Sequence, residues 1–253
     1  MTIGALNVIS GHLSGDAALD TAMSRAILQR VGTGDLPETL QVGMPHRVLA
    51  FGKHDALADG FPDAVATAVE RGYDPTVRIA GGRAVVFHPG IVRFAWTVPE
   101  RDPALTMHDR FKLAANAVIA SLATFGVESE VGELPNEYCA GAYSVHLRDG
   151  GKVMGVGQRL SRTAAQVGGM IAVDDAASIN SVLVPIYRSL DIPLDPGATA
   201  SVAEAATVDP ESMADELARQ LAAGRVIVNV APDHPTVRLA AELRPDHVPG
   251  PLA

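Results

Sequence analysis

The sequence predicts an α+β protein with a mixed or antiparallel sheet flanked by helices. Segments rich in β-branched and aromatic residues gather in the middle of the chain. Apolar residues at helical spacing occur before, between and after those segments. Strands and helices therefore do not alternate strictly, as they would in a parallel sheet built from βαβ units.

In the first half of the chain, helices and short strands follow one another irregularly. A helix is expected over 14–31, with Ser14 or Asp16 as its N-cap and Gly32 as its stop. Two short strands joined by a Gly-Met-Pro turn are expected over 39–52. A second helix and three strands separated by Gly-Gly and Pro-Gly turns follow; they are the helix 59–72 and the strands 76–79, 84–88 and 92–98.

The second half begins with an amphipathic helix over 106–125, closed by Gly126. Three β-rich segments follow at 143–147, 152–159 and 168–173. The expected elements after them are a short helix, a loop, a strong helix, a strand and a Pro-rich end, over 181–190, 191–201, 209–223, 226–230 and 232–253. After Asp174 the β-rich segments give way to mainly helical and Pro-containing ones. This change predicts two segments: a main domain over 1–180 and a helical, accessory C-terminal extension over 181–253.

Composition excludes several classes of protein. The 253 residues, 47% hydrophobic and 19% charged, suit one globular domain with or without a small appendage. A net charge of −9 argues against nucleic-acid binding and against docking on anionic membranes. The first twenty residues lack a signal-peptide pattern, and no apolar run is long enough to span a bilayer. With one cysteine and no intramolecular disulfide, we expect a soluble, cytoplasmic protein.

A first candidate site is the segment from Arg78 to His88, which contains Gly81-Gly82-Arg83-Ala84-Val85. Two consecutive glycines let the backbone approach a ligand closely, and flanking arginines can hold a carbonyl, carboxylate or phosphate. The alternative is an ordinary hairpin turn with solvent-exposed arginines. His88 is either catalytic or a polar side chain satisfied at a strand end.

A second candidate site combines the cysteine with a lysine. Cys139 lies in a loop between Pro135 and Gly141, where a thiol can be exposed. Lys152, one of only three lysines beside 17 arginines, follows across one strand and one turn. A hairpin would bring this cation towards the thiol, and a nearby cation favours the thiolate. The alternative is a small buried Cys with no chemical role.

Other familiar motifs are absent from the sequence. The Gly155-Val156-Gly157 segment lacks the third glycine of a dinucleotide fingerprint, and Gly151-Lys152-Val153 lacks the features of a P-loop. The eight histidines form no zinc-binding pattern, so no metal is expected. No GxSxG motif is present, which leaves serine-hydrolase chemistry unsupported.

Taken together, the segments from Ser14 to Asp174 resemble the lipoate–protein ligase/octanoyltransferase superfamily, which has the biotinyl/lipoyl ligase fold. The motifs that carry the resemblance occur in family order. They are Phe51-Gly52-Lys53-His54-Asp55, Arg78-x-x-Gly81-Gly82-Arg83-Ala84-Val85 with His88, and Lys152-Val153-Met154-Gly155-Val156-Gly157-Gln158-Arg159.

Within the superfamily, the chain is most similar to the cysteine-dependent lipoyl/octanoyl amidotransferase branch. Glu137-Tyr138-Cys139-Ala140-Gly141 resembles that branch's Tyr-Cys-Pro-Gly element, with Ala140 in place of proline. Arg83 stands where the ATP-dependent ligases usually have a third glycine. The resemblance implies that Cys139 forms a thioester acyl-enzyme and that Lys152 is the general acid/base. It also implies a narrow acyl channel; the residues expected to bind substrate are Arg78, Gly81, Gly82, Arg83, Ala84, Val85, His88, Gly155, Gly157 and Gln158.

The resemblance therefore predicts an octanoyl- or lipoyl-transferase that needs no cofactor. Its expected partners are lipoyl-domain proteins, namely the glycine-cleavage H protein and 2-oxoacid dehydrogenase E2 subunits, and also acyl carrier protein. The first alternative is a lipoate–protein ligase that uses ATP and Mg²⁺, with Lys152 on the acyl-adenylate. The second is a non-catalytic relative that binds acyl chains or lipoyl domains, which a distance between Cys139 and Lys152 well beyond contact would favour.

Overall fold

The computed structural model describes residues 4–11 and 14–250. Its larger sheet has the strand order β11-β1-β2-β6-β10-β9-β8-β7. Strand β1 pairs in parallel with β2 and β11, and the other neighbours are antiparallel. The bounds are β1 (Leu6–Ser10), β2 (Thr39–Gly43), β6 (Ile91–Pro99), β7 (Ser129–Val131), β8 (Val145–Leu147), β9 (Lys152–Leu160), β10 (Ala164–Ala172) and β11 (Ile227–Asn229). This mixed sheet confirms the predicted fold class.

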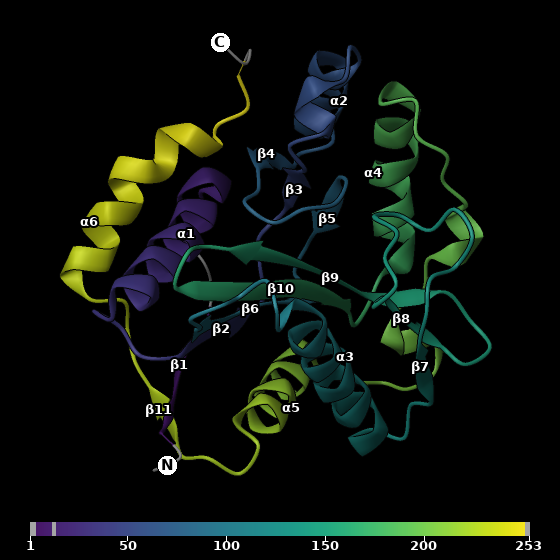
Figure 1. Ribbon diagram of the computed structural model, residues 1–253. Coiled ribbons are helices and arrows are strands. Elements are labelled where there is room, and N and C mark those ends of the chain that lie inside the picture. Colours follow the sequence, from purple (N-terminus) through teal and green to yellow (C-terminus); the bar gives the residue numbers. More distant parts are fainter. Residues whose placement is uncertain (1–3, 12–13, 251–253) are drawn as a thin grey trace.

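Three further strands form a separate small sheet above the large one (Figure 1). They are β3 (Val48–Phe51), β4 (Asp74–Val77) and β5 (Val85–Phe87), in the order β4-β3-β5. Strand β3 is buried along its whole length. Because β5 and β6 are separated only by the turn at 88–90, the sequence alone does not reveal that the two strands join different sheets.

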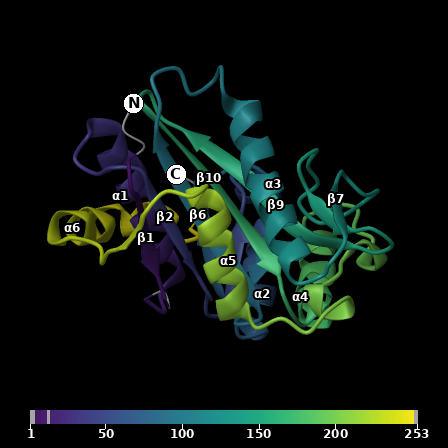
Figure 2. The same ribbon diagram turned by 90° about the horizontal axis from the view of Figure 1, so that it is seen from below.

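Helices cover both faces of the large sheet (Figures 1 and 2). Helices α3 and α5 pack on one face around the main apolar core. Helix α1 lies on the opposite face with α6 against it, while α2 and α4 pack with the small sheet. The bounds are α1 (Ala17–Thr33), α2 (Phe61–Glu70), α3 (Met107–Thr124), α4 (Ala176–Ser189), α5 (Pro210–Ala222) and α6 (His234–Leu243). Among the described residues, no helix has the length and apolarity needed to cross a membrane.

The two ends of α1 test the predicted caps. The Asp16 side chain accepts the backbone N–H of Leu19 at 2.9 Å, so Asp16 rather than Ser14 is the N-cap. The predicted stop at Gly32 is wrong, because the helix continues to Thr33 and ends at Gly34 with φ +83°. Gly32 instead permits close packing: a Cβ there would lie 3.1 Å from the Thr163 hydroxyl oxygen in the β9–β10 turn.

Three elements were not predicted: β1, β7 and α6. The Pro-rich composition of 232–253 suggested irregular backbone, but Asp233 caps α6 by accepting the Thr236 N–H at 3.0 Å. Pro235 lies in the first turn of this helix, where a missing N–H has no consequence. The proline therefore marks a helix start rather than a break.

The predicted division at residue 180 stays a prediction. Helix α4 runs through that position, β11 extends the large sheet beside β1, and α5 packs against α3. The outermost residues of the two predicted segments, 1–3 and 251–253, lie outside the described residues.

Because α5 shares the main core, truncating a buried side chain on it should weaken the whole fold. Leu217 is fully buried, and we expect Leu217→Ala to lower the free energy of unfolding by about 2–5 kcal/mol. The matched control Leu113→Ala, at a 55% exposed position on α3, should change it by about 0.5 kcal/mol or less. Urea unfolding followed by circular dichroism measures both; equal effects would contradict the shared core.

Candidate active site

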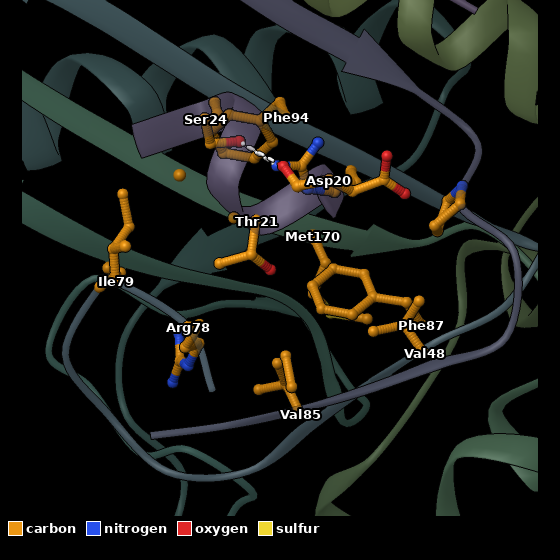
Figure 3. A pocket seen from close by; sticks show the side chains of 18 of the residues that line it. Asp20, Thr21, Ser24, Val48, Arg78, Ile79, Val85, Phe87, Phe94 and Met170 are labelled. Atoms are coloured by element: carbon orange, nitrogen blue, oxygen red, sulfur yellow. Dashed lines mark hydrogen bonds between the residues drawn. The ribbon is translucent and has the colours of Figure 1, made fainter. Parts of the chain in front are cut away.

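A cavity of about 110 Å³ lies between the large sheet, the small sheet and α1. Figure 3 shows its lining side chains, with Arg78 and Val85 on one side and Asp20 and Ser24 on the opposite side. The small sheet contributes mainly apolar side chains, and α1 contributes short polar ones. The lining includes Asp20, Ser24, Arg78, Val85, Arg93, Cys139, Gly155, Gly157, Gly168 and Met170.

The space exists because the facing strands carry little side-chain volume. Met170 on β10 pairs with Gly155 on β9, and the next pair on this face is Gly168 with Gly157. Side chains at alternate positions of a strand point to one face, so these pairs lie side by side beneath the cavity. Three of the four residues are glycines, which leaves room for an elongated ligand across the sheet.

Cys139 lies at one end of this cavity in a constrained backbone conformation, with φ +43°. Its Sγ accepts a hydrogen bond from Arg78 Nη2 at 3.2 Å and another from the Arg83 backbone N–H at 3.3 Å. A positive φ is uncommon for a residue other than glycine and is found where surrounding structure enforces it. The loop therefore presents the sulfur to two donors instead of burying it as an inert apolar side chain.

The Gly81-Gly82 turn makes this approach possible. Gly82 has φ +98°, and a Cβ on it would lie 2.6 Å from both Cys139 Sγ and Arg78 Nη2. No residue with a Cβ fits this position without displacing the thiol. The first candidate segment is therefore a close-approach turn against the cysteine, rather than a free hairpin with exposed arginines.

The electrostatics of the loop favour the thiolate. Burial raises the pKa of Cys139, but the positive charges of Arg78 and Lys152 and the two hydrogen bonds to the sulfur outweigh burial. The net result is a pKa below the ordinary value of a cysteine thiol. A larger fraction of Cys139 is thus present as the nucleophilic thiolate at neutral pH.

Lys152 converges on the same loop but does not bond the sulfur. Its Nζ donates to the carbonyl oxygens of Tyr138 and Cys139 at 2.8 and 3.0 Å, and to Glu137 Oε1 at 2.9 Å. The ammonium also lies 4.7 Å from the centre of the Tyr138 ring. Lys152 is fully buried, so these contacts replace its hydration. The wide separation of Lys152 from the cysteine that would favour a non-catalytic relative is not found, because Nζ contacts the Cys139 carbonyl oxygen.

Glu137 is the counter-charge that permits a lysine at this depth. Besides Lys152, its side chain accepts from the Ser144 hydroxyl and from the N–H groups of Gly141 and Leu134. Glu137 is 3% exposed, and both carboxylate oxygens have partners. The carboxylate thus binds the backbone before and after Cys139 and, through Lys152, connects the cysteine loop to β9. Sequence reasoning assigned Glu137 no role, although it lies two residues before the cysteine.

Tyr187 on α4 fixes the loop from the other side. Its hydroxyl accepts the Cys139 backbone N–H at 2.6 Å and donates to the Ala84 carbonyl at 3.0 Å. One side chain thus joins the cysteine loop to the glycine turn, although 48 residues separate it from Cys139. No local pattern around Tyr187 indicates this contact.

The remaining residues expected to bind substrate divide into two groups. Val85, Gly155 and Gly157 line the cavity, and Gly81 lies beside it with its carbonyl 3.3 Å from the Cβ position of Gly157. Arg83 contributes its backbone N–H to the thiol, whereas its exposed side chain pairs with Asp55 at 3.3 Å.

Three residues point elsewhere. Gln158 lies on the other face of β9 from Gly157, where it accepts from Arg110 Nε and donates to the Met107 carbonyl. Ala84 takes part only through its carbonyl on Tyr187. His88 is buried outside the cavity; its Nδ1 accepts the Gly90 N–H, and burial lowers its pKa. His88 thus lies at a strand end, as one of the two alternatives expected, but it is only partly satisfied, because its buried Nε2 has no hydrogen-bond partner among the described residues.

Within residues 4–11 and 14–250, no cluster of three or more metal-ligating side chains is found.

The cavity, the glycine turn and the buried lysine all lie within the part of the chain that a family model matches. Residues 16–221 fit the model of the lipoyl protein ligase A/B catalytic domain. The chain belongs to this family.

Curated relatives lie in one branch of the family. The chain is 25% identical over 175 residues to an octanoyl-[GcvH]:protein N-octanoyltransferase of Geobacillus kaustophilus, covering 69% of this chain and 62% of the relative. It is 26% identical over 169 residues to the enzyme of the same name from Bacillus velezensis, covering 67% and 58%. The matches thus span about three fifths of the length of these relatives.

Solved structures share the fold. A lipoate-protein ligase A bound with ATP superposes with a TM-score of 0.76 at 19% identity, covering 96% of this chain and 94% of the other. A putative lipoate protein ligase from T. acidophilum with bound lipoic acid gives a TM-score of 0.75 at 18% identity, with 96% of each chain covered. At these identities the comparison establishes the fold alone.

Removing the Arg78 charge should raise the pKa of Cys139. We expect Arg78→Met to move the pH profile of iodoacetamide alkylation to higher pH and to slow the reaction at pH 7, because less thiolate is present below the pKa. Since Cys139 is the only cysteine, intact-mass spectrometry reads this directly. Arg162→Met, at an exposed position in the β9–β10 turn, is the control and should leave the profile unchanged. An unshifted profile for Arg78→Met would contradict the assigned electrostatics.

Neutralising Glu137 should destabilise the protein strongly. Glu137→Gln leaves the Lys152 ammonium buried without a counter-charge, and losing one partner of a buried pair costs about 3–5 kcal/mol. Glu128→Gln, which breaks the exposed pair with Arg148, should cost about 1 kcal/mol or less. Urea unfolding at neutral pH compares the two, and similar losses would refute the proposed importance of burial.

Proposed function

We propose that this protein moves octanoyl or lipoyl groups between lipoyl-domain proteins through a thioester on Cys139. The observation that carries the proposal is the position of the Cys139 thiol at the end of a largely apolar cavity. Its sulfur accepts hydrogen bonds there from Arg78 and from the Arg83 N–H. A cavity of this kind suits an uncharged acyl chain, because each buried CH₂ contributes about 0.8 kcal/mol. The names of the curated relatives are consistent with this chemistry.

In the first half-reaction, the Cys139 thiolate attacks the carbonyl carbon of the carrier-bound acyl group. A C–S bond forms, and the bond between the acyl carbon and the carrier's nitrogen or sulfur breaks. If the departing atom is an amine nitrogen, it takes up a proton. In the second half-reaction, a lysine amine of the acceptor attacks the thioester. A C–N bond forms, that amine loses a proton, and Cys139 leaves again as the thiolate.

We assign different parts of this chemistry to the surrounding residues. Arg78 and the Arg83 N–H stabilise the thiolate as nucleophile and as leaving group. Lys152 holds the loop through the Tyr138 and Cys139 carbonyls, and from there it is the group that we propose to exchange protons with the carrier's lysine. The covalent route draws its energy from the acyl donor, so we propose no requirement for ATP or Mg²⁺.

The partners that we propose are a GcvH protein and a second lipoyl-domain protein such as an E2 subunit, with acyl carrier protein as a further donor, and we place the reaction in the cytoplasm. The family relationship and the names of the relatives support GcvH most directly.

Incubation with octanoyl-GcvH should add one octanoyl mass to the protein as a hydroxylamine-sensitive thioester. Cys139→Ser should lose that adduct and reduce transfer to the acceptor by about 100-fold or more, because the nucleophile is removed. Octanoyl-acyl carrier protein is tested in parallel as the second donor.

The ligase alternative gives a different result in the same assay. It predicts octanoate- or lipoate-dependent release of pyrophosphate from ATP, with full activity in Cys139→Ser. Either that result, or the absence of any adduct on the wild-type protein from both donors, would refute the proposal.

A further inference from the structure

A groove of about 510 Å³ adjoins the acyl cavity, and the proposed thioester chemistry does not use it. It lies between α1, the residues that follow β3 and β4, the end of β9 and the residues that follow α6. Figure 1 shows the turn between β9 and β10 beside α1, where the Thr163 hydroxyl donates to the Gly32 carbonyl at 2.6 Å. Arg78 and Ile79 line both the groove and the cavity, so the two spaces share a wall.

The lining of this groove is strongly positive. Its side chains that are charged at neutral pH are Arg25, Lys53, Arg78, Arg159 and Asp246. Asp246 is the one carboxylate among them, and it pairs with Arg25 at 2.7 Å. The other three cations form no ion pair with a carboxylate among the described residues, except that of a transferred partner has to be supplied from outside. An unpaired positive surface thus lies on a chain whose net charge is −9.

Lys53 and Arg159 are the cations of the groove that a partner can reach. Both are exposed, Lys53 just after β3 and Arg159 on β9. Arg78, in contrast, already donates to the Cys139 sulfur and to a backbone carbonyl. His247 also lines the groove, but burial lowers its pKa, so it adds no charge at neutral pH. The groove therefore presents two exposed positive side chains next to the arginine that contacts the thiol.

The position of the groove is one that a carrier protein has to cover. An acyl chain attached at Cys139 runs into the cavity, so the protein that delivers it lies outside, at the Cys139 end. Arg78 Nη2 is 3.2 Å from the sulfur, and the same side chain lines the groove. A specific protein–protein contact buries about 800 Å² on each partner, which is more than the surface around one side chain. A carrier whose lysine reaches the thiol therefore extends over the neighbouring groove.

The charges of the groove select the surface that fits it. A basic or apolar surface would cover Lys53 and Arg159 without pairing them, which costs the hydration of both charges. Acidic side chains would pair with them. A nucleic acid is also negative, but it is negative along its whole length, and the acidic remainder of this chain repels it. A protein needs its acidic side chains only at the contact.

We propose that this groove docks the carrier protein, with Lys53 and Arg159 contacting acidic side chains that surround the carrier's acylated lysine. This inference rests on the proposed function for the identity of the carrier, and it adds the surface on which that carrier binds. Arg78 stays with the thiol, so docking and thiol activation belong to neighbouring but different side chains. Attraction between the two surfaces also orients the carrier before contact, and salt weakens it because ions screen charges over about 8 Å at physiological ionic strength.

Binding of unacylated GcvH tests the groove without any acyl chemistry. Isothermal titration should give a dissociation constant that rises about threefold or more between about 50 and about 200 mM NaCl. Lys53→Glu and Arg159→Glu should each raise it about fivefold or more at the lower salt concentration, because a repulsive charge replaces an attractive one. The matched control is Lys112→Glu, at an exposed position of α3 on the other face of the large sheet, and it should change the constant by about twofold or less.

Lys53 also permits a test of direct contact. A carbodiimide joins an amine to a carboxylate that touches it, forming an amide with loss of water. The chain has three lysines, and because Lys152 is buried, Lys53 and Lys112 are the exposed ones. Peptide mass spectrometry should find the amide to GcvH at Lys53 and none at Lys112. Lys53→Arg keeps the charge but loses the amine, so it should keep the affinity and lose the cross-link.

Several results would overturn the inference. Unchanged affinity in both Lys53→Glu and Arg159→Glu is one, and a cross-link confined to Lys112 is another. A wild-type protein that does not bind GcvH at the lower salt concentration is a third. Titration with inorganic phosphate gives the fourth, since phosphate binding that both substitutions abolish, with no effect on GcvH, identifies a small-anion site. Far-UV circular dichroism checks folding, and Lys53→Gln and Arg159→Gln replace a charge reversal that prevents it.

Octanoyl-GcvH separates this inference from the proposed function. Weaker GcvH binding in the two variants, with no thioester on the wild-type protein, would leave the docking surface standing and defeat the proposed function. Thioester formation at equal rates in the wild-type protein and both variants, at carrier concentrations below saturation, would do the reverse.

Discussion

The site depends on one buried ion pair. Lys152 and Glu137 neutralise each other in the interior, and together they bind the backbone on both sides of Cys139. The lysine donates hydrogen bonds to carbonyl oxygens of the loop, and the carboxylate accepts them from its N–H groups, so the loop's backbone has both a donor and an acceptor to bind. A loop with positive φ at Asn136 and Cys139 is costly by itself, and such a conformation persists where its surroundings determine it fully. The conformation that brings the sulfur to Arg78 and the Arg83 N–H is therefore held by this network.

The cavity follows from a second constraint, the small volume of the residues on the facing strands. Gly155, Gly157 and Gly168 leave the sheet surface bare, and the small sheet covers it from the opposite side. Helix α1 closes the space with short polar side chains, so the cavity has the Cys139 thiol on one side and polar side chains of α1 on another.

Sequence reasoning reached the local parts of this arrangement and missed the long-range ones. The fold class, the thiol and the lysine followed from periodicity, from turn residues and from a resemblance of short motifs. Contacts such as Tyr187 on Cys139 could not be read, because they join residues far apart in the chain and leave no spacing pattern. Successive residues of a strand point to opposite faces, so Gln158 faces α3 while its neighbour Gly157 faces the cavity. The sequence motif identified both residues, but it did not show which face of the strand each occupies. Helix α6 was hidden by prolines whose position, not number, decides their effect.

The pairing of β1 between β2 and β11 has a consequence for the order in which the molecule is assembled on the ribosome. The N-terminal strand obtains its second neighbour only when residues 227–229 have been synthesised, and the cysteine loop obtains its Tyr187 hydroxyl only after α4 has emerged. Contacts between such distant parts of a chain form slowly, because a long loop must close first. The cysteine loop of the nascent polypeptide therefore lacks one of its fixed contacts until α4 has emerged, and the large sheet is completed later still.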